Sequence, residues 1–167
     1  LNSFFYFLGG TVKFNLLILF FIINYISFSS TKSAYDYEIT EKRGIIYLKK
    51  DSSPFTGKVI IKKDRSFYLE GKPHGKWLTF YPNGNLKSIE SWKNGKLFGK
   101  YILYQENGTK IFETTYLNGK DNGNYFLFHP NGQIQVQGRF KNGIPKGVWK
   151  YYNSKGKLIG KATYPDN

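Results

Sequence analysis

Residues 75–98 read GKWLTFYPNGNLKSIESWKNGKLF and contain two Asn-Gly pairs, at 83–84 and at 94–95. Each pair follows a run that is rich in aromatic or aliphatic residues. Asn and Gly both accept the positive φ angles of a two-residue hairpin turn, so an Asn-Gly pair between such runs is a strong hairpin signal. The segment therefore predicts a β-hairpin that is closed by Asn-Gly turns.

The same pattern returns every 24 residues along the rest of the chain. Gly75, Gly99, Gly123 and Gly147 lead the successive units. The predicted turn glycines are Gly84, Gly95, Gly108, Gly119, Gly132, Gly143 and Gly156. A fixed period of this length is typical of a repeat protein, in which each small unit buries its apolar side against its neighbours.

Hydrophobicity alternates within the second half of each unit, as in a half-buried strand. In the first unit, Leu86 and Trp92 alternate with Lys87 and Ser91. The first halves are apolar on both alternations, and we expect three of their rings to be partly exposed: Trp77, Trp149 and Tyr151. The predicted fold class is all-β, an elongated single-layer twisted antiparallel sheet of about nine or ten strands in tandem hairpins.

The N-terminal segment 1–34 is predicted to be a signal peptide or a membrane anchor helix. Lys13 precedes the uncharged run FNLLILFFIINYISF at 14–28, and small residues up to Ala34 follow it. This order is typical of a secretory signal, although an uncleaved anchor over 13–30 stays open. We therefore expect an exported protein, in the periplasm, the cell envelope or the medium, or one anchored by residues 13–30.

The exported part divides into three zones. Residues 35–50 form a lead-in with one strand-like run at 44–48, and residues 51–74 form a degenerate repeat with a shortened hairpin. A variant terminal unit is what a capping repeat requires, because the end of a stack has no neighbour to cover it. Residues 75–167 hold four 24-residue repeats, of which the last is truncated.

Catalytic and metal-binding groups are scarce. The chain has no cysteine, only two histidines, and eleven scattered acidic residues. Zinc sites and general-acid pairs need several such groups in one place. His74 and His129 fall in predicted surface loops, and Glu90 and Glu113 are expected on opposite sides of the sheet. We predict no enzyme activity, no cofactor and no metal.

The net charge of +14 favours anionic or acidic partners, although scattered lysines also keep an aromatic-rich sheet soluble. Lysines and rings recur in phase near the leading glycines, and these residues form the predicted binding face: Lys76, Lys100, Lys150, Trp77, Tyr101, Tyr125, Trp149 and Tyr151. We predict a protein partner or self-association. Binding to an anionic membrane surface or cell-wall glycan is the alternative, and nucleic acid is disfavoured.

The pattern Gly-x-Trp/Tyr-x-x-Tyr/Phe-x-x-x-Gly, followed by aromatic-x-Asn-Gly-Lys, resembles the MORN repeat and most closely its bacterial variant. The match covers residues 75–164 well and 51–74 in part. The resemblance implies an elongated, right-handed-twisted antiparallel sheet of hairpins. Bacterial relatives are often catalogued as antitoxins, which implies protein binding. Eukaryotic relatives are associated with membrane tethering, phosphoinositides and self-association.

Overall fold

The computed structural model describes residues 32–50 and 52–166, within the folded unit Thr31–Asn167. The predicted N-terminal helix and the 13–30 anchor lie outside these residues. Ser33 and Ala34, the last residues of the expected leader segment, lie in the strand Ser33–Tyr35. No described helix has the length and apolarity to cross a membrane.

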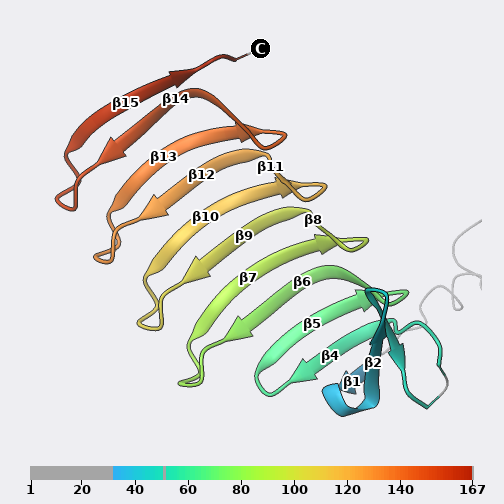
Figure 1. Cartoon of the computed structure of the whole chain (residues 1–167). Coiled ribbons are helices and arrows are strands. Elements are labelled where there is room, and N and C mark those ends of the chain that lie inside the picture. Colours follow the sequence, from blue (N-terminus) through green and yellow to red (C-terminus); the bar gives the residue numbers. More distant parts are fainter. Residues whose placement is uncertain (1–31, 51, 167) are drawn as a thin grey trace, which may run out of the picture. The chain divides into compact units, whose positions relative to one another are not determined.

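The described unit is all-β, with one short 3-10 helix, η1 (Asp36–Glu38). Its strands follow one another along the chain as ribbons that lie side by side (Figure 1). They are β1 (Ser33–Tyr35), β2 (Ile39–Lys42), β3 (Ile45–Leu48), β4 (Gly57–Ile61), β5 (Asp64–Leu69), β6 (Lys72–Phe80), β7 (Leu86–Lys93), β8 (Lys96–Leu97), β9 (Gly99–Tyr104), β10 (Lys110–Leu117), β11 (Lys120–Asp121), β12 (Gly123–Phe128), β13 (Ile134–Lys141), β14 (Ile144–Tyr152) and β15 (Leu158–Tyr164).

A 13-stranded sheet contains all of these strands except β2 and β3. The long twisted sheet of hairpins is confirmed, but the expected count of about nine or ten strands was too low. Two of the additional strands are the short pieces β8 and β11, which pair with β7 and β10. A further one is β1, which pairs parallel to β4 and so departs from the antiparallel rule. Strands β2 and β3 form a separate antiparallel pair.

The Asn-Gly pairs make two different turns. Between repeats, both residues have positive φ, for example 51° at Asn94 and 82° at Gly95, as predicted. Within repeats only the glycine does, with φ of 91° at Gly84. There the Gly84 N–H donates to the Tyr81 carbonyl at 2.8 Å. The Asn83 side chain accepts from the Asn85 N–H at 2.8 Å. The predicted two-residue turn is therefore wrong for these loops, which are longer and stabilised by the Asn carboxamide.

The inter-repeat turns also join neighbouring units. The N–H of each turn glycine donates to a carbonyl 22 residues earlier, at 2.7–2.8 Å: Gly95 to Pro73, Gly119 to Leu97 and Gly143 to Asp121. These bonds fix the spacing between repeats because each one satisfies a donor of one turn with an acceptor of the preceding unit.

The N-terminal end of the sheet holds a compact core, which we call the N-terminal cap. Its buried members are Ala34, Ile46, Leu48, Phe55 and Val59, each at most 8% exposed. They come from β1, β3, β4 and the segment before β4, so the lead-in and the degenerate repeat fold together. Their joint burial removes the apolar end of the stack from water, which is the role expected of a cap.

Candidate functional site

The predicted binding residues lie on two opposite faces of the sheet. Directly paired residues on neighbouring strands share a face, and successive residues on one strand alternate between faces. Trp77 pairs with Glu90, whereas the preceding Lys76 pairs with Ser91. The same alternation holds in β9 and β14. Trp77, Tyr101, Tyr125, Trp149 and Tyr151 therefore share one side, the aromatic face. Lys76, Lys100 and Lys150 lie on the other, the basic face.

Ring contacts run across the strands on the aromatic face. Ring centroids lie 5.2 Å apart for Trp77 and Trp92, and 5.2 Å apart for Tyr101 and Phe112. Further along the sheet, Tyr125 lies 5.6 Å from Trp149. Such tilted and offset pairs stabilise by more than the area they bury. The aromatic positions of the repeat therefore hold neighbouring hairpins together.

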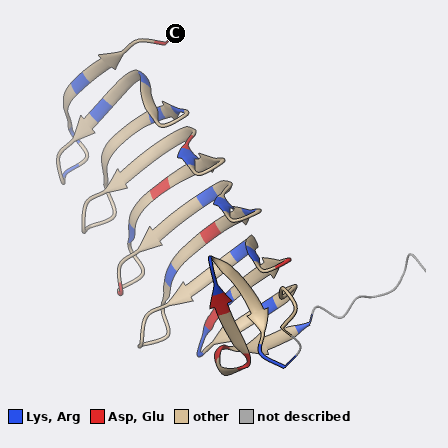
Figure 2. Cartoon of the chain, turned by 45° about the vertical axis from the view of Figure 1, so that its right-hand side comes forward, with Lys and Arg blue, Asp and Glu red and all other residues tan. Residues whose placement is uncertain are grey.

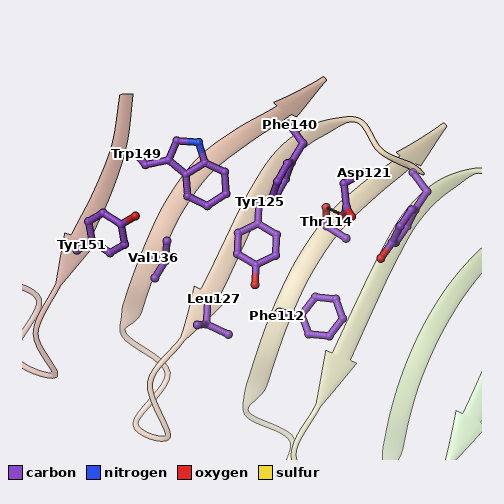
Figure 3. Close-up of a pocket in the computed structure, with 10 residues that line it drawn as sticks. Phe112, Thr114, Asp121, Tyr125, Leu127, Val136, Phe140, Trp149 and Tyr151 are labelled. Atoms are coloured by element: carbon purple, nitrogen blue, oxygen red, sulfur yellow. Dashed lines mark hydrogen bonds between the residues drawn. The ribbon is translucent and has the colours of Figure 1, made fainter. Parts of the chain in front are cut away.

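A shallow depression of about 410 Å³ opens on this face between β10 and β14 (Figure 3). Its lining residues are Phe112, Thr114, Tyr116, Asp121, Tyr125, Leu127, Val136, Phe140, Trp149 and Tyr151. We call it the aromatic groove. Tyr151 and Trp77 are half-buried as expected, but the expected exposure of Trp149 is wrong because only 7% of it is accessible.

Two residues explain the burial of Trp149. Gly138 lies beneath the six-membered ring of the indole, where any Cβ would overlap it. Phe140 meets the same indole edge-on, with centroids 4.9 Å apart. The indole Nε1–H is buried, and no described residue offers it a hydrogen-bond acceptor. Apolar burial therefore holds this ring against the cost of an unsatisfied donor.

Asp121 is the acidic residue of the aromatic groove, and no role was predicted for it from the sequence. Its Oδ1 accepts a bond of 2.9 Å from Thr114 Oγ1, and Thr114 is 1% exposed. Burial, together with the charge of Asp121, raises the pKa of Tyr116 and of Tyr125 above its ordinary value of 10.0. The sequence did contain a signal for Asp121, because the equivalent positions one period before and after it hold the apolar residues Leu97 and Pro145.

A second polar group crosses the aromatic face nearer the N-terminal cap. The hydroxyls of Thr79 and Ser88 lie 2.7 Å apart, and Ser88 donates to Glu90 Oε1 at 3.0 Å. Trp92 Nε1 donates to the other oxygen of Glu90 at 2.9 Å. The Glu90 carboxylate thus holds the Ser88 and Trp92 side chains in place.

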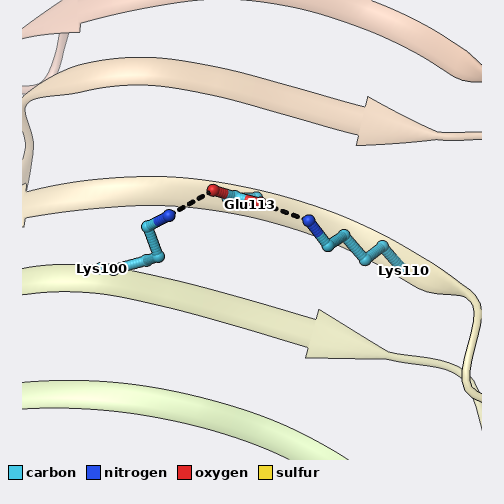
Figure 4. Close-up of polar contacts among 3 residues, drawn as sticks. All are labelled: Lys100, Lys110 and Glu113. Atoms are coloured by element: carbon cyan, nitrogen blue, oxygen red, sulfur yellow. Dashed lines mark hydrogen bonds and ion pairs between the residues drawn. The ribbon is translucent and has the colours of Figure 1, made fainter.

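The basic face carries one compensated group of charges (Figure 4). Glu113 lies 2.9 Å from Lys100 and 2.7 Å from Lys110. Hydrogen bonds from these two lysines lower the pKa of Glu113 below its ordinary value of 4.5. Glu113 pairs with Ile102 and Glu90 with Trp77, so the two glutamates face opposite sides, as predicted.

Towards the C-terminus the basic face loses its carboxylates. Strands β14 and β15 show basic segments and no acidic ones (Figure 2). A shallow polar hollow of about 280 Å³ is lined by Arg139 and Lys150 with Asn124, Gln137, Gly138 and Val148. Among the described residues, no salt bridge involves Arg139, Lys150 or Lys161.

The histidines have structural positions. His129 Nε2 lies 2.9 Å from the carbonyl oxygen of Tyr152, which ties one loop to the next repeat. His74 meets the Phe67 ring edge-on at 6.3 Å. Within residues 32–50 and 52–166, no three His, Cys, Asp or Glu residues gather closely enough to hold a metal ion.

The geometry defines a class: a tandem β-hairpin repeat protein with an aromatic and a basic face. The family of MORN repeat variants matches three segments, 73–94, 121–142 and 145–164. These three segments match the MORN repeat variant, which confirms the resemblance there.

No match to the chain was found among curated proteins. The solved structures that match include a chain described as "Glycosylation Associate Protein (Gap123) complex from Streptococcus agalactiae". It is 17% identical, and the match covers 82% of this chain but only 24% of that one, with a TM-score of 0.34. At that score the likeness supports no inference about fold or function.

Proposed function

We propose that the chain is a non-enzymatic repeat scaffold that binds a partner protein through its aromatic face. The observation that carries this proposal is the aromatic groove, a shallow depression lined by half-buried rings. Tyrosine and tryptophan are enriched at protein interfaces because each offers a large apolar surface together with a polar tip. The MORN repeat is a binding module, which agrees with this use.

The polar groups of the aromatic face argue for binding over catalysis. Asp121 is engaged by buried Thr114, and Glu90 is engaged by Ser88 and Trp92. A general acid or base needs a free lone pair or proton directed at a substrate, within hydrogen-bond reach. These two carboxylates fix side chains of the sheet itself, which favours a structural role for both.

We further propose that the chain is exported or is anchored by residues 13–30, and that its partner relationship is antitoxin-like or self-associating. Basic Lys13 and the apolar run 14–28 support export. Cleavage would have to precede Ser33, because Ala34 is 1% exposed within the N-terminal cap. A fusion of residues 1–32 to a periplasmic reporter enzyme tests export, and loss of reporter activity on Leu17→Arg and Ile23→Arg is the expected control.

Photo-crosslinking tests the binding face. A photoreactive phenylalanine derivative replaces Tyr125 in one variant and Asn124 in another. These neighbours lie on the same strand and point to opposite faces. We expect a discrete protein adduct from position 125 and none from position 124. Equal yields from both positions, or adducts from 124 alone, would contradict the proposal.

The alternative function is binding of an anionic membrane surface or cell-wall glycan through the basic face. The exposed side chain of Lys100 and the absence of acidic residues from β14 and β15, next to Lys150, favour it. Surface binding of this kind weakens with salt because the contacts are screened. Co-sedimentation with anionic vesicles or peptidoglycan across a salt series tests it, with Lys150→Glu expected to reduce pelleting.

A further inference from the structure

The two ends of the sheet differ. At the N-terminal end, β1 and β4 lie within the N-terminal cap. At the other end of the described residues, β14 is the one strand that pairs with β15, and none of the residues of β15 is buried. An edge strand of this kind presents unpaired backbone N–H and C=O groups on its outer side, which can accept another strand.

One row of paired residues crosses the basic face and ends at this edge. Each member lies directly opposite the next: Leu78, Ile89, Ile102, Glu113, Phe126, Gln137, Lys150 and Lys161. Every second member of this row occupies the same position of the 24-residue repeat. In successive repeats this position holds Ile89, Glu113, Gln137 and Lys161. In the middle of the row, the charge of Glu113 is balanced by Lys100 and Lys110. At the end of the row, both members are lysines.

Lys150 and Lys161 form the end of the row and are directly opposite each other. Like charges in this position destabilise a strand pair. A carboxylate placed next to Lys161 would offset that repulsion, as Glu113 does between Lys100 and Lys110. The charge at the edge therefore favours an acidic strand and disfavours another basic one.

The aromatic face of β15 leaves space for a ring. Gly160 and Ala162 lie on this face, opposite Tyr151 and Trp149. Two strands earlier, Gly138 shows the effect of such a small residue, because its missing Cβ makes room for the indole of the following strand, β14. A strand added beyond β15 could place an aromatic side chain over Gly160, which has no Cβ, in the same way.

We propose that the outer edge of β15 receives an extended, acidic segment of a partner protein as an added strand. This segment carries an aromatic residue on the aromatic face and, next to it in sequence, an Asp or Glu opposite Lys161. The inference rests on the proposed protein-binding function and names its surface and partner chemistry. A second copy pairing through β15 would add its own lysines to this edge and no carboxylate from β14 or β15, which charge repulsion opposes.

Synthetic peptides serve as probes. The acidic probe has the sequence of residues 144–152, with Lys146→Glu and Lys150→Glu, and a fluorescent label. The first control peptide is the unchanged sequence 144–152. The second carries the acidic sequence with the residues at 149 and 150 exchanged, which moves the ring to the wrong face. Anisotropy titrations use the full chain and its Lys161→Glu variant, whose folding is checked by circular dichroism.

We expect the acidic probe to bind the chain about tenfold more tightly than either control. The Lys161→Glu variant should reverse the order of the acidic and unchanged peptides. Absence of binding, or a peptide order that Lys161→Glu leaves unchanged, would overturn the inference. The inference would also be overturned if sedimentation equilibrium showed a dimer that does not bind the peptide. The same holds if Lys161→Glu abolished binding to anionic vesicles and left peptide binding unchanged. Adducts from position 125 would still support the broader proposed function in each case.

Discussion

The indole ring of Trp149 occupies the space that a Cβ atom would need at residue 138. Gly138 has no positive φ, so its requirement is steric and not conformational. Gly160 also lies in a strand without positive φ, and a Cβ there would meet Tyr151 at 3.9 Å, an ordinary contact. The two positions differ in what faces them, which allows a matched comparison.

We predict that Gly138→Ala lowers the free energy of unfolding by about 1–3 kcal/mol, because the ring or the backbone must move. Gly160→Ala should leave stability unchanged or raise it by up to about 1 kcal/mol, because alanine restricts the unfolded chain. Urea unfolding followed by circular dichroism measures both. Equal losses at the two positions would show that Trp149 does not impose the requirement.

We predict that replacing Trp77 and Trp149 by phenylalanine changes the free energy of unfolding by different amounts. Trp77 Nε1 donates to the Phe67 carbonyl at 2.8 Å, whereas the buried Trp149 Nε1 has no partner in the part of the chain that the structure describes. Trp77→Phe loses a bond worth about 1 kcal/mol, and Trp149→Phe removes an unsatisfied donor that costs about 1–3 kcal/mol. We expect Trp77→Phe to destabilise at least as much, although Trp149 is the more buried ring. A clearly larger loss for Trp149→Phe in urea titrations would contradict this.

One substitution should act in opposite directions at the two kinds of turn. Asn118 has φ of 52°, and glycine adopts this conformation more readily. Asn107 instead accepts a 2.9 Å bond from the Thr109 N–H. Asn118→Gly should preserve or raise thermal stability, whereas Asn107→Gly should cost about 1 kcal/mol. Thermal melts of the two variants provide the measurement, and a loss at both positions would argue against two turn types.

Glu113 makes stability depend on pH. Lys110 and Lys100 lower its pKa, so its contribution is complete above the ordinary value of 4.5 and disappears as pH falls through the lowered pKa. Because both lysines are substantially exposed, the contribution is under about 1 kcal/mol. Glu113→Gln should therefore be less stable than the parent at pH 7 and equal to it near pH 2. A constant difference across that range would mean that charge is not the cause.

Tyrosine titration tests the electrostatics of the aromatic groove. Asp121→Asn should bring the pKa values of Tyr116 and Tyr125 closer to 10.0, and leave that of Tyr101 in place. Glu90→Gln should bring the pKa of Tyr101 closer to 10.0 and leave those of Tyr116 and Tyr125 in place, because burial and the charge of Glu90 raise the pKa of Tyr101. NMR of ring-labelled tyrosine follows each residue separately. Burial is the larger cause in all three, so only part of each shift should disappear.

The repeats could be predicted from sequence because the constraint is local. Asn-Gly pairs, alternation and a fixed 24-residue spacing each act within one hairpin. The opposite orientation of Lys76 and Trp77 also follows from alternation, and grouping them as one binding face overlooked it. The parallel pairing of β1 with β4 could not be found in this way, because the lead-in has no sister unit with which to compare it.

The aromatic groove depended on contacts that the pattern does not encode. Gly138 resembles a turn or bulge residue in the sequence, but in the structure it makes room for a ring from the next strand. Asp121 was detectable only as the polar member of an otherwise apolar position. Its bond to Thr114 depends on how β10 and β11 pair.

The position of the N-terminal cap has a consequence for synthesis. Within residues 32–50 and 52–166, every strand from β5 onward pairs with near neighbours in sequence, and the core of the N-terminal cap precedes them. A ribosome needs about 1–5 s to add one 24-residue unit, whereas a hairpin forms in about 1–10 μs. Each emerging hairpin therefore meets a finished template, and the sheet can grow by accretion while translation continues.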